Sequence, residues 1–199
     1  MRVNTEAKCN SDAQSLPISK KAAVNLSTVS DKVVLSYLKT TYDKTEKEPD
    51  VTIEGLVKDT DYSVTYSNNV NAGTATVTIV GMNDYVGTLY QYFTIEPAKM
   101  TGVSVHGYKG TYDESIHTIT LDGVPEGAVV TYASEESGIY SEMKPDRRSA
   151  GTTTVYYKIK KANYEELKGC VKIVIEAAPI AEKKVELSDV SYVYDGTAK

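Results

Sequence analysis

Residues 61–79 read DYSVTYSNNVNAGTATVTI, and this stretch decides the fold class. Its first half alternates large apolar or aromatic residues with small polar ones, and its second half alternates apolar residues with threonine. A period of two places every other side chain on the same face of a β-strand. The Asn and Gly residues between the two halves favour a turn. We therefore predict strands near 62–66 and 74–80, with Tyr62, Val64, Tyr66, Ala75, Val77 and Ile79 facing a core.

The whole chain is rich in residues that favour strands. Its 199 residues include 23 Val, 22 Thr, 16 Tyr and 11 Ile, but one Phe and no Trp. Because β-branched and aromatic side chains fit a pleated surface, this composition predicts an all-β protein. No stretch of about 10 or more residues has a helical period. No apolar run approaches the roughly 20 residues that a membrane helix needs, so we expect no membrane insertion.

Five landmarks recur in the same order along the chain. The clearest is a Tyr-Asp motif at Tyr42-Asp43, Tyr112-Asp113 and Tyr194-Asp195, with spacings of 70 and 82 residues. The other four pair Val64-Thr65-Tyr66 with Val130-Thr131-Tyr132, Ala72-Gly73-Thr74 with Ala150-Gly151-Thr152, Asn83-Asp84-Tyr85 with Ala162-Asn163-Tyr164, and Thr94–Ala98 with Val174–Pro179. Recurrence at this spacing indicates tandem structural units.

The landmarks divide the chain into four parts. We expect 1–32 to be a linker or the tail of a preceding module. Two repeats, 33–98 and a diverged 99–179, should each hold five to seven short strands, which predicts tandem small immunoglobulin-like β-sandwiches. The first strands should cover 33–42 and 102–112. An alternative fold, a β-grasp-like repeat, requires a helix packed on the sheet.

The last part, 180–199, is expected to hold a linker and the first strand of a truncated third repeat. We expect this strand, 185–199, to lie on the second repeat or on a neighbouring molecule. Short joints that contain proline, Glu96-Pro97-Ala98 and Ala177-Ala178-Pro179, connect the repeats. Such joints act as semi-rigid spacers.

The last hairpin of each repeat presents a different outward face. In the first repeat the outward residues are uncharged, and the candidate ligand-binding residues are Tyr90, Tyr92, Thr76 and Thr78. A surface of aromatic rings and hydroxyls can stack on sugar rings. The competing interpretation is cross-strand Tyr–Thr pairing without a ligand, worth roughly 0.2–1 kcal/mol per pair. In the second repeat the outward residues are Thr152, Thr154, Tyr156, Lys158, Lys160, Lys168, Cys170 and Lys172.

Charge is distributed unevenly between the repeats. The formal net charge is −5, and residues 33–98 alone hold 4 Lys against 9 acidic residues. This acidity excludes a nucleic-acid binder that relies on net positive charge. The lysines of the second repeat either attract acidic polymers or keep the sheet from pairing with another sheet.

The sequence contains no motif that carries chemistry. It has no glycine-rich phosphate loop, no serine nucleophile elbow and no zinc-protease helix. Its two histidines, His106 and His117, have no cysteine near them, and Cys9 and Cys170 are expected to be free thiols. We therefore expect no catalytic residues, no metal and no cofactor, and so a protein that is not an enzyme.

Residues 61–79 and Tyr194–Lys199 (YDGTAK) resemble the MBG-type and YDG-type repeat modules of Gram-positive cell-surface proteins and adhesins. These modules are often found in tandem with bacterial immunoglobulin-like domains. The second repeat resembles a diverged sibling through Gly110–Asp113 and Ala150–Thr152.

This resemblance implies an extracellular protein, either secreted or attached to the cell wall. It implies a non-catalytic stalk that spaces other domains from the wall, with the neighbouring repeats of the same chain as partners. The alternative is a module that binds glycans or a host surface protein through its Tyr- and Thr-bearing face.

Overall fold

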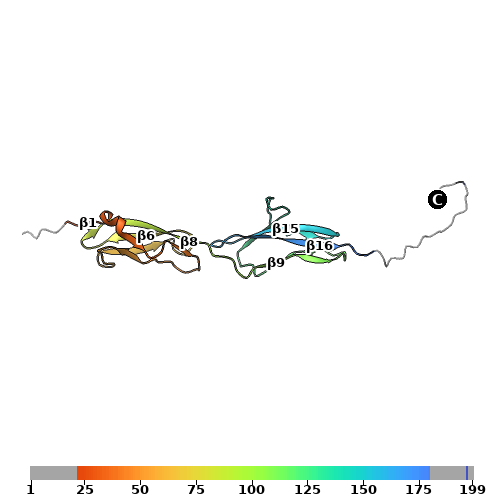
Figure 1. The fold of residues 1–199 in the computed structure, drawn as a ribbon, viewed down its shortest axis with the longest axis horizontal. Coiled ribbons are helices and arrows are strands. Elements are labelled where there is room, and N and C mark those ends of the chain that lie inside the picture. The colour runs from red at the N-terminus through yellow and green to blue at the C-terminus, as the bar shows by residue number, and fades with distance from the viewer. Residues whose placement is uncertain (1–21, 180–195, 197–199) are drawn as a thin grey trace, which may run out of the picture. The chain divides into compact units, whose positions relative to one another are not determined.

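The computed structural model describes residues 22–179 and residue 196, and it is mostly β (Figure 1). The chain forms two compact units. Unit 1 runs up to Ile95 and unit 2 begins at Glu96, except that Thr41–Thr45 is grouped with unit 2. The prediction of a β-rich chain with two small β units is confirmed in this coarse form. Cys9 lies outside the described residues, and so does the strand predicted at 185–199, apart from Gly196.

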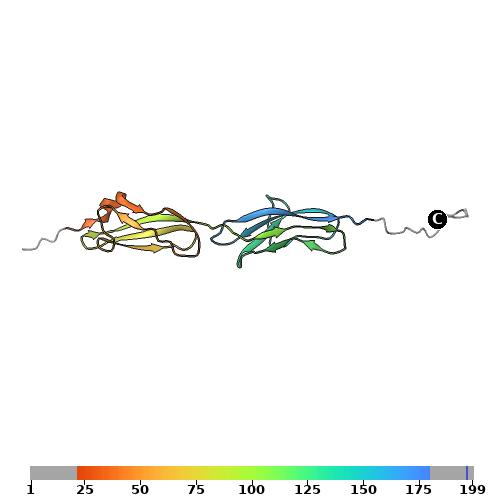
Figure 2. The same ribbon diagram turned by 60° about the horizontal axis from the view of Figure 1, so that its bottom comes forward.

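Unit 1 contains one larger sheet and two smaller strand pairs (Figure 2). The larger sheet has the order β3 (Lys39–Thr41), β8 (Thr88–Glu96), β6 (Gly73–Gly81), β5 (Tyr62–Ser67). The smaller pairs are β2 (Val33–Leu35) with β4 (Val51–Ile53), antiparallel, and β1 (Val24–Asn25) with β7 (Tyr85–Val86), parallel.

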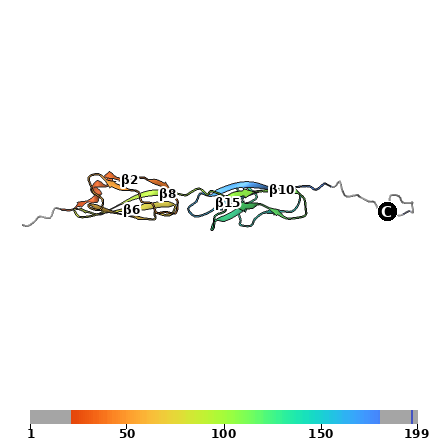
Figure 3. The same cartoon turned by 90° about the horizontal axis from the view of Figure 1, so that it is seen from below.

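Unit 2 repeats this plan (Figure 3). Its larger sheet has the order β10 (Tyr108–Thr111), β16 (Leu167–Glu176), β15 (Gly151–Lys160), β13 (Val129–Ala133). The smaller pairs are β9 (Ser104–His106) with β12 (Thr120–Asp122), and β11 (His117–Thr118) with β14 (Asp146–Arg147). In the larger sheet β10 runs parallel to β16, and the other neighbours are antiparallel.

The core of unit 1 lies between the larger sheet and the β2–β4 pair. Fully or nearly fully buried residues come from both layers: Val51, Ile53, Tyr62, Ala75, Val77, Ile79, Phe93 and Ile95. The Tyr62 hydroxyl donates to the Val51 carbonyl at 2.9 Å, and the Tyr66 hydroxyl donates to the Pro49 carbonyl at 2.6 Å. Burial raises the pKa of both phenols. Tyrosine thus fills the core and hydrogen bonds the backbone of the opposite layer, which phenylalanine cannot do.

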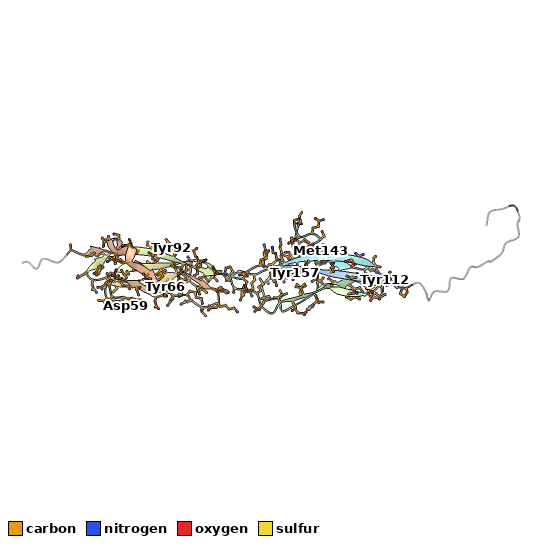
Figure 4. All side chains as sticks on the ribbon, viewed as in Figure 1. Asp59, Tyr66, Tyr92, Tyr112, Met143 and Tyr157 are labelled. Atoms are coloured by element: carbon orange, nitrogen blue, oxygen red, sulfur yellow. The ribbon has the colours of Figure 1, made fainter. Side chains whose placement is uncertain are left out.

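The core of unit 2 is built in the same way. Its buried cluster is Ile119, Tyr132, Val155 and Ile173, surrounded by Val105, Tyr108, Leu121, Val130, Tyr157 and Val171 (Tyr157 is labelled in Figure 4). These residues belong to both the larger sheet and the smaller strands, so the sheets enclose one core. Burying each branched side chain contributes about 1.5–3 kcal/mol.

The predicted first strand of each unit is wrong in one respect. Each stretch, 33–42 and 102–112, is broken in the middle and its halves join different sheets. In unit 2 the break falls at Gly107, where a Cβ atom would collide with the Lys172 carbonyl oxygen. Glycine lets the two backbones approach closely, so the chain can change sheets here.

Residues 22–32, predicted to belong to a linker or to the tail of a preceding module, contribute to unit 1. Strand β1 pairs with β7, and a short 3-10 helix follows at Leu26–Lys32 with Leu26 fully buried. The Asn25 side chain caps this helix by accepting the Ser27 N–H at 2.9 Å. Within 33–179, both repeats lack the helix that the β-grasp alternative requires.

The Tyr-Asp motif forms the same turn in both repeats, 33–98 and 99–179. The Asp43 carboxylate accepts the Thr45 N–H at 2.9 Å, and the Asp113 carboxylate accepts the Ser115 N–H at 2.9 Å. This is an Asx turn, and its central residue has left-handed backbone. The central φ is 75° at Lys44, 66° at Glu114, and 82° at Gly196 of the third motif.

Candidate functional site

The four candidate residues of the first repeat lie together on the outer face of unit 1. In the pairing of β6 with β8, Thr78 is opposite Tyr90 and Thr76 is opposite Tyr92. The tyrosine side chains are 58% and 57% exposed (Tyr92 is labelled in Figure 4). The neighbouring positions Val77, Ile79 and Phe93 are buried, so the predicted alternation is confirmed.

The outward surface continues onto β5, which the sequence analysis did not include. Thr65 is opposite Thr78, and Ser67 is opposite Thr76. The same period of two identifies them, because they alternate with the core residues Tyr62, Val64 and Tyr66. We call the outward residues of the three strands the Tyr/Thr face: Ser63, Thr65, Ser67, Thr74, Thr76, Thr78, Val80, Thr88, Tyr90, Tyr92 and Thr94. It offers hydroxyls and two aromatic rings, and the one charged outward side chain of these three strands is that of Glu96, at the end of β8.

The two histidines lie at strand ends in unit 2 and pair with carboxylates. His106 Nε2 is 3.6 Å from the Asp122 carboxylate, and His117 Nε2 is 2.9 Å from the Asp113 carboxylate. The hydrogen bond from His117 is the main cause that lowers the pKa of Asp113. The His117 ring also stacks on Tyr108, with centroids 3.8 Å apart. Among residues 22–179, no cluster of three or more His, Cys, Asp or Glu side chains is placed to hold a metal ion.

The outer face of unit 2 carries the predicted lysines. Across β15 and β16, Lys158 is opposite Lys168, Tyr156 is opposite Cys170, and Thr154 is opposite Lys172. Cys170 is a free, exposed thiol. Lys160 forms an ion pair with Glu166 at 3.0 Å, and this contact lowers the pKa of Glu166.

The main surface feature that the sequence analysis missed is a loop of residues 134–145, which follows β13 and lies before β14 and β15; we call it the β13–β15 loop. It stands away from the sheet beside β15 (Figure 1). Tyr132 and Ser141 exchange two backbone hydrogen bonds of 2.7 and 2.9 Å at its base. The Lys158 ammonium lies 3.8 Å from the centre of the Tyr140 ring. Ile139 and Met143 are 96% and 81% exposed (Met143 is labelled in Figure 4).

No helix in the described part of the chain is long and apolar enough to cross a membrane. A scan against models of protein families found no match, and no curated protein matches this sequence.

Proposed function

We propose that this chain is a non-catalytic stalk module of a bacterial cell-surface protein, in which tandem immunoglobulin-like β-sandwiches space other domains from the cell wall. The protein would be extracellular, secreted or attached to the wall. The observation that carries the proposal is that one turn, with a left-handed central residue, recurs along the chain. Both repeats contain the same Asx turn, and Gly196 supplies the left-handed residue at the same position of the third motif. A backbone plan repeated along one chain is typical of an array of modules.

The sheets support the immunoglobulin-like assignment within this proposal. In each unit a split first strand contributes to both sheets, and the sheets enclose a core of apolar and tyrosine side chains. The resemblance of 61–79 and 194–199 to MBG- and YDG-type modules points to the same class. In a stalk the partners are the neighbouring repeats, and no catalytic group is required.

Small-angle X-ray scattering of residues 22–179 tests the spacer function. Strands of about ten residues make each unit roughly 30–35 Å long, so two units end to end should give a longest dimension of about 70 Å. If the same residues formed a single compact body, its radius of gyration would instead be about 15 Å. A radius of that size would contradict the proposal. A variant with a Gly-Ser insertion after Pro97 serves as the flexible control.

A second candidate function is glycan binding through the Tyr/Thr face. The observation that favours it is the side-by-side exposure of Tyr90 and Tyr92 next to threonine hydroxyls. A glycan array should then give a signal for the wild type that is lost in Tyr90→Ala/Tyr92→Ala. Tyr112→Ala, which removes a 39% exposed tyrosine from unit 2, is the matched control. The absence of any wild-type signal would reject this function.

A further inference from the structure

We propose that unit 2 carries a binding site for an acidic sugar, in the hollow between the β13–β15 loop and the outer face of β15 and β16. The proposal does not depend on the spacer function. The hollow has a volume of about 220 Å³. Its lining includes Glu136, Tyr140, Tyr156, Lys168 and Cys170. Sites for drug-sized ligands are about 300–1,000 Å³, so this hollow suits one sugar ring of a longer chain.

Of the charged side chains that line the hollow, Lys168 is positive and Glu136 is negative, and two lysines beside the lining, Lys158 and Lys172, shift the local charge toward an anionic ligand. Lys158 and Lys168 are directly opposite each other on neighbouring antiparallel strands, and like charges in this position repel. Lys172 lies on the same face of β16, two positions beyond Cys170. Among the described residues, Lys168 and Lys172 have no ion-pair partner, in contrast to Lys160 with Glu166. A bound carboxylate would neutralise this repulsion.

The aromatic side chains indicate that the anion belongs to a sugar. Tyr140 and Tyr156 line the hollow, and the ammonium of Lys158 is held over the Tyr140 ring at 3.8 Å. A tyrosine ring offers an apolar face to the C–H groups of a pyranose and a hydroxyl to its polar edge. An ammonium beside such a ring forms a charge-assisted hydrogen bond with a carboxylate. Glu136 also lines the hollow, and its negative charge repels a densely charged phosphate polymer more strongly than a sugar with one carboxylate per ring.

The loop that closes the hollow accounts for the extra length of unit 2. Tyr66 and Gly73 are 7 positions apart in unit 1, whereas Tyr132 and Gly151 are 19 positions apart in unit 2. This difference equals the difference between the Tyr-Asp spacings of 70 and 82 residues. Since the loop is already fixed by the hydrogen bonds between Tyr132 and Ser141, a ligand would pay little conformational entropy to order it.

The test is a titration of the chain of 199 residues, followed by NMR. The probes are an oligogalacturonate of four sugars, a neutral oligogalactose of the same length, inorganic phosphate and a short DNA duplex. We expect the acidic sugar alone to shift the signals of Tyr156, Lys168 and Cys170. Lys168→Glu should weaken its binding at least about tenfold, because one charge-assisted hydrogen bond is replaced by repulsion. The matched control is Lys109→Glu, which changes the same charge on β10.

Each other outcome overturns the proposal. These outcomes are no shift with the acidic sugar at millimolar concentration, equal shifts with the neutral sugar, an equal response to phosphate or DNA, or unchanged binding in Lys168→Glu. A thermal melt confirms that Lys168→Glu is folded. Shifts at Thr76 and Tyr92 report the glycan-binding candidate of unit 1, so the two binding hypotheses can fail separately.

Discussion

Units 1 and 2 share their backbone devices and differ on the outer faces of their larger sheets. Both have a glycine with positive φ at the start of the central strand (Gly73, Gly151) and an asparagine with positive φ in the last hairpin loop (Asn83, Asn163), and the Asx turn occurs in both sequence repeats. Outside the cores, one sheet displays threonine and tyrosine, and the other displays lysine and a long loop. The comparison teaches that the recurring landmarks specify backbone conformation, while the surface can diverge for binding.

The faces also differ in how they stabilise their sheets. In unit 1, Thr78–Tyr90 and Thr76–Tyr92 are favourable cross-strand pairs. In unit 2, Lys158 is opposite Lys168, which is unfavourable until an anion or an aromatic ring offsets the charge. The following predictions test whether the cores and turns are equivalent, as this comparison implies.

The largest effect is expected from truncating a large buried side chain. Phe93 is 2% exposed in unit 1, and Phe93→Ala should lower the free energy of unfolding of this unit by about 3–5 kcal/mol. Urea unfolding followed by NMR signals assigned to each unit measures this. Unit 2 should unfold at its original urea concentration, and an equal loss in both units would show that they do not fold independently. Ile173→Ala is the reciprocal variant in unit 2.

A smaller effect is expected from removing one core hydroxyl. Tyr62→Phe leaves the Val51 carbonyl without its hydrogen bond, which should cost unit 1 about 1–3 kcal/mol. Because burial raises the pKa of Tyr62, the wild-type contribution is complete below the unfolded pKa near 10 and is lost as pH rises through the folded pKa. Unit 1 of the wild type should therefore lose more stability in strong alkali than Tyr62→Phe does. Parallel pH curves for both proteins would contradict this.

The Asx turn predicts a stabilising substitution. Glu114 has a φ of 66°, a conformation that costs an ordinary residue about 1–2 kcal/mol and glycine almost nothing. Glu114→Gly should raise the stability of unit 2 by about 1 kcal/mol, as the third motif indicates by using Gly196 here. Glu114→Ala, measured by the same thermal melt, should give no gain. Equal melting temperatures for the two variants would refute the role of the left-handed position.

The smallest effect concerns acid. The hydrogen bond from His117 lowers the pKa of Asp113, so its contribution is present above the unfolded Asp pKa and is lost as pH falls through the folded value. Melting temperatures of unit 2 should therefore fall between pH 5 and strong acid by slightly more in the wild type than in His117→Ala. Identical pH profiles would show that this pair does not contribute to stability.

Much of the fold and of the Tyr/Thr face could be predicted because both depend on a period of two. The alternation in β6 and β8 placed Tyr90 and Tyr92 outside and Phe93 inside, which the structure confirms. The break at Gly107 was not predicted, although the alternation changes phase there: the half-buried positions are Val103 and Val105 before the break and Tyr108 after it, and the two halves join different sheets.

Two further features escaped prediction for other physical reasons. The stretch from Val24 to Lys32 forms a strand of two residues and a 3-10 helix, which are too short to show a period. The loop after β13 was visible as a longer interval between landmarks. The contact that holds it against the sheet joins Tyr140 of the loop to Lys158 of β15, and sequence spacing does not predict such a contact.

The parallel pairing of β10 with β16 has a mechanical consequence. Tension on the two chain ends of unit 2 pulls Tyr108 and Glu176 in opposite directions along adjacent strands. The four residue pairs from Tyr108–Ile173 to Thr111–Glu176 are then sheared together, whereas a hairpin opened from its end loses its hydrogen bonds one by one. Single-molecule stretching should show a higher rupture force for pulling through the chain ends than for peeling β16 away from β15. Strands β10 and β16 thus form a clamp against stretching.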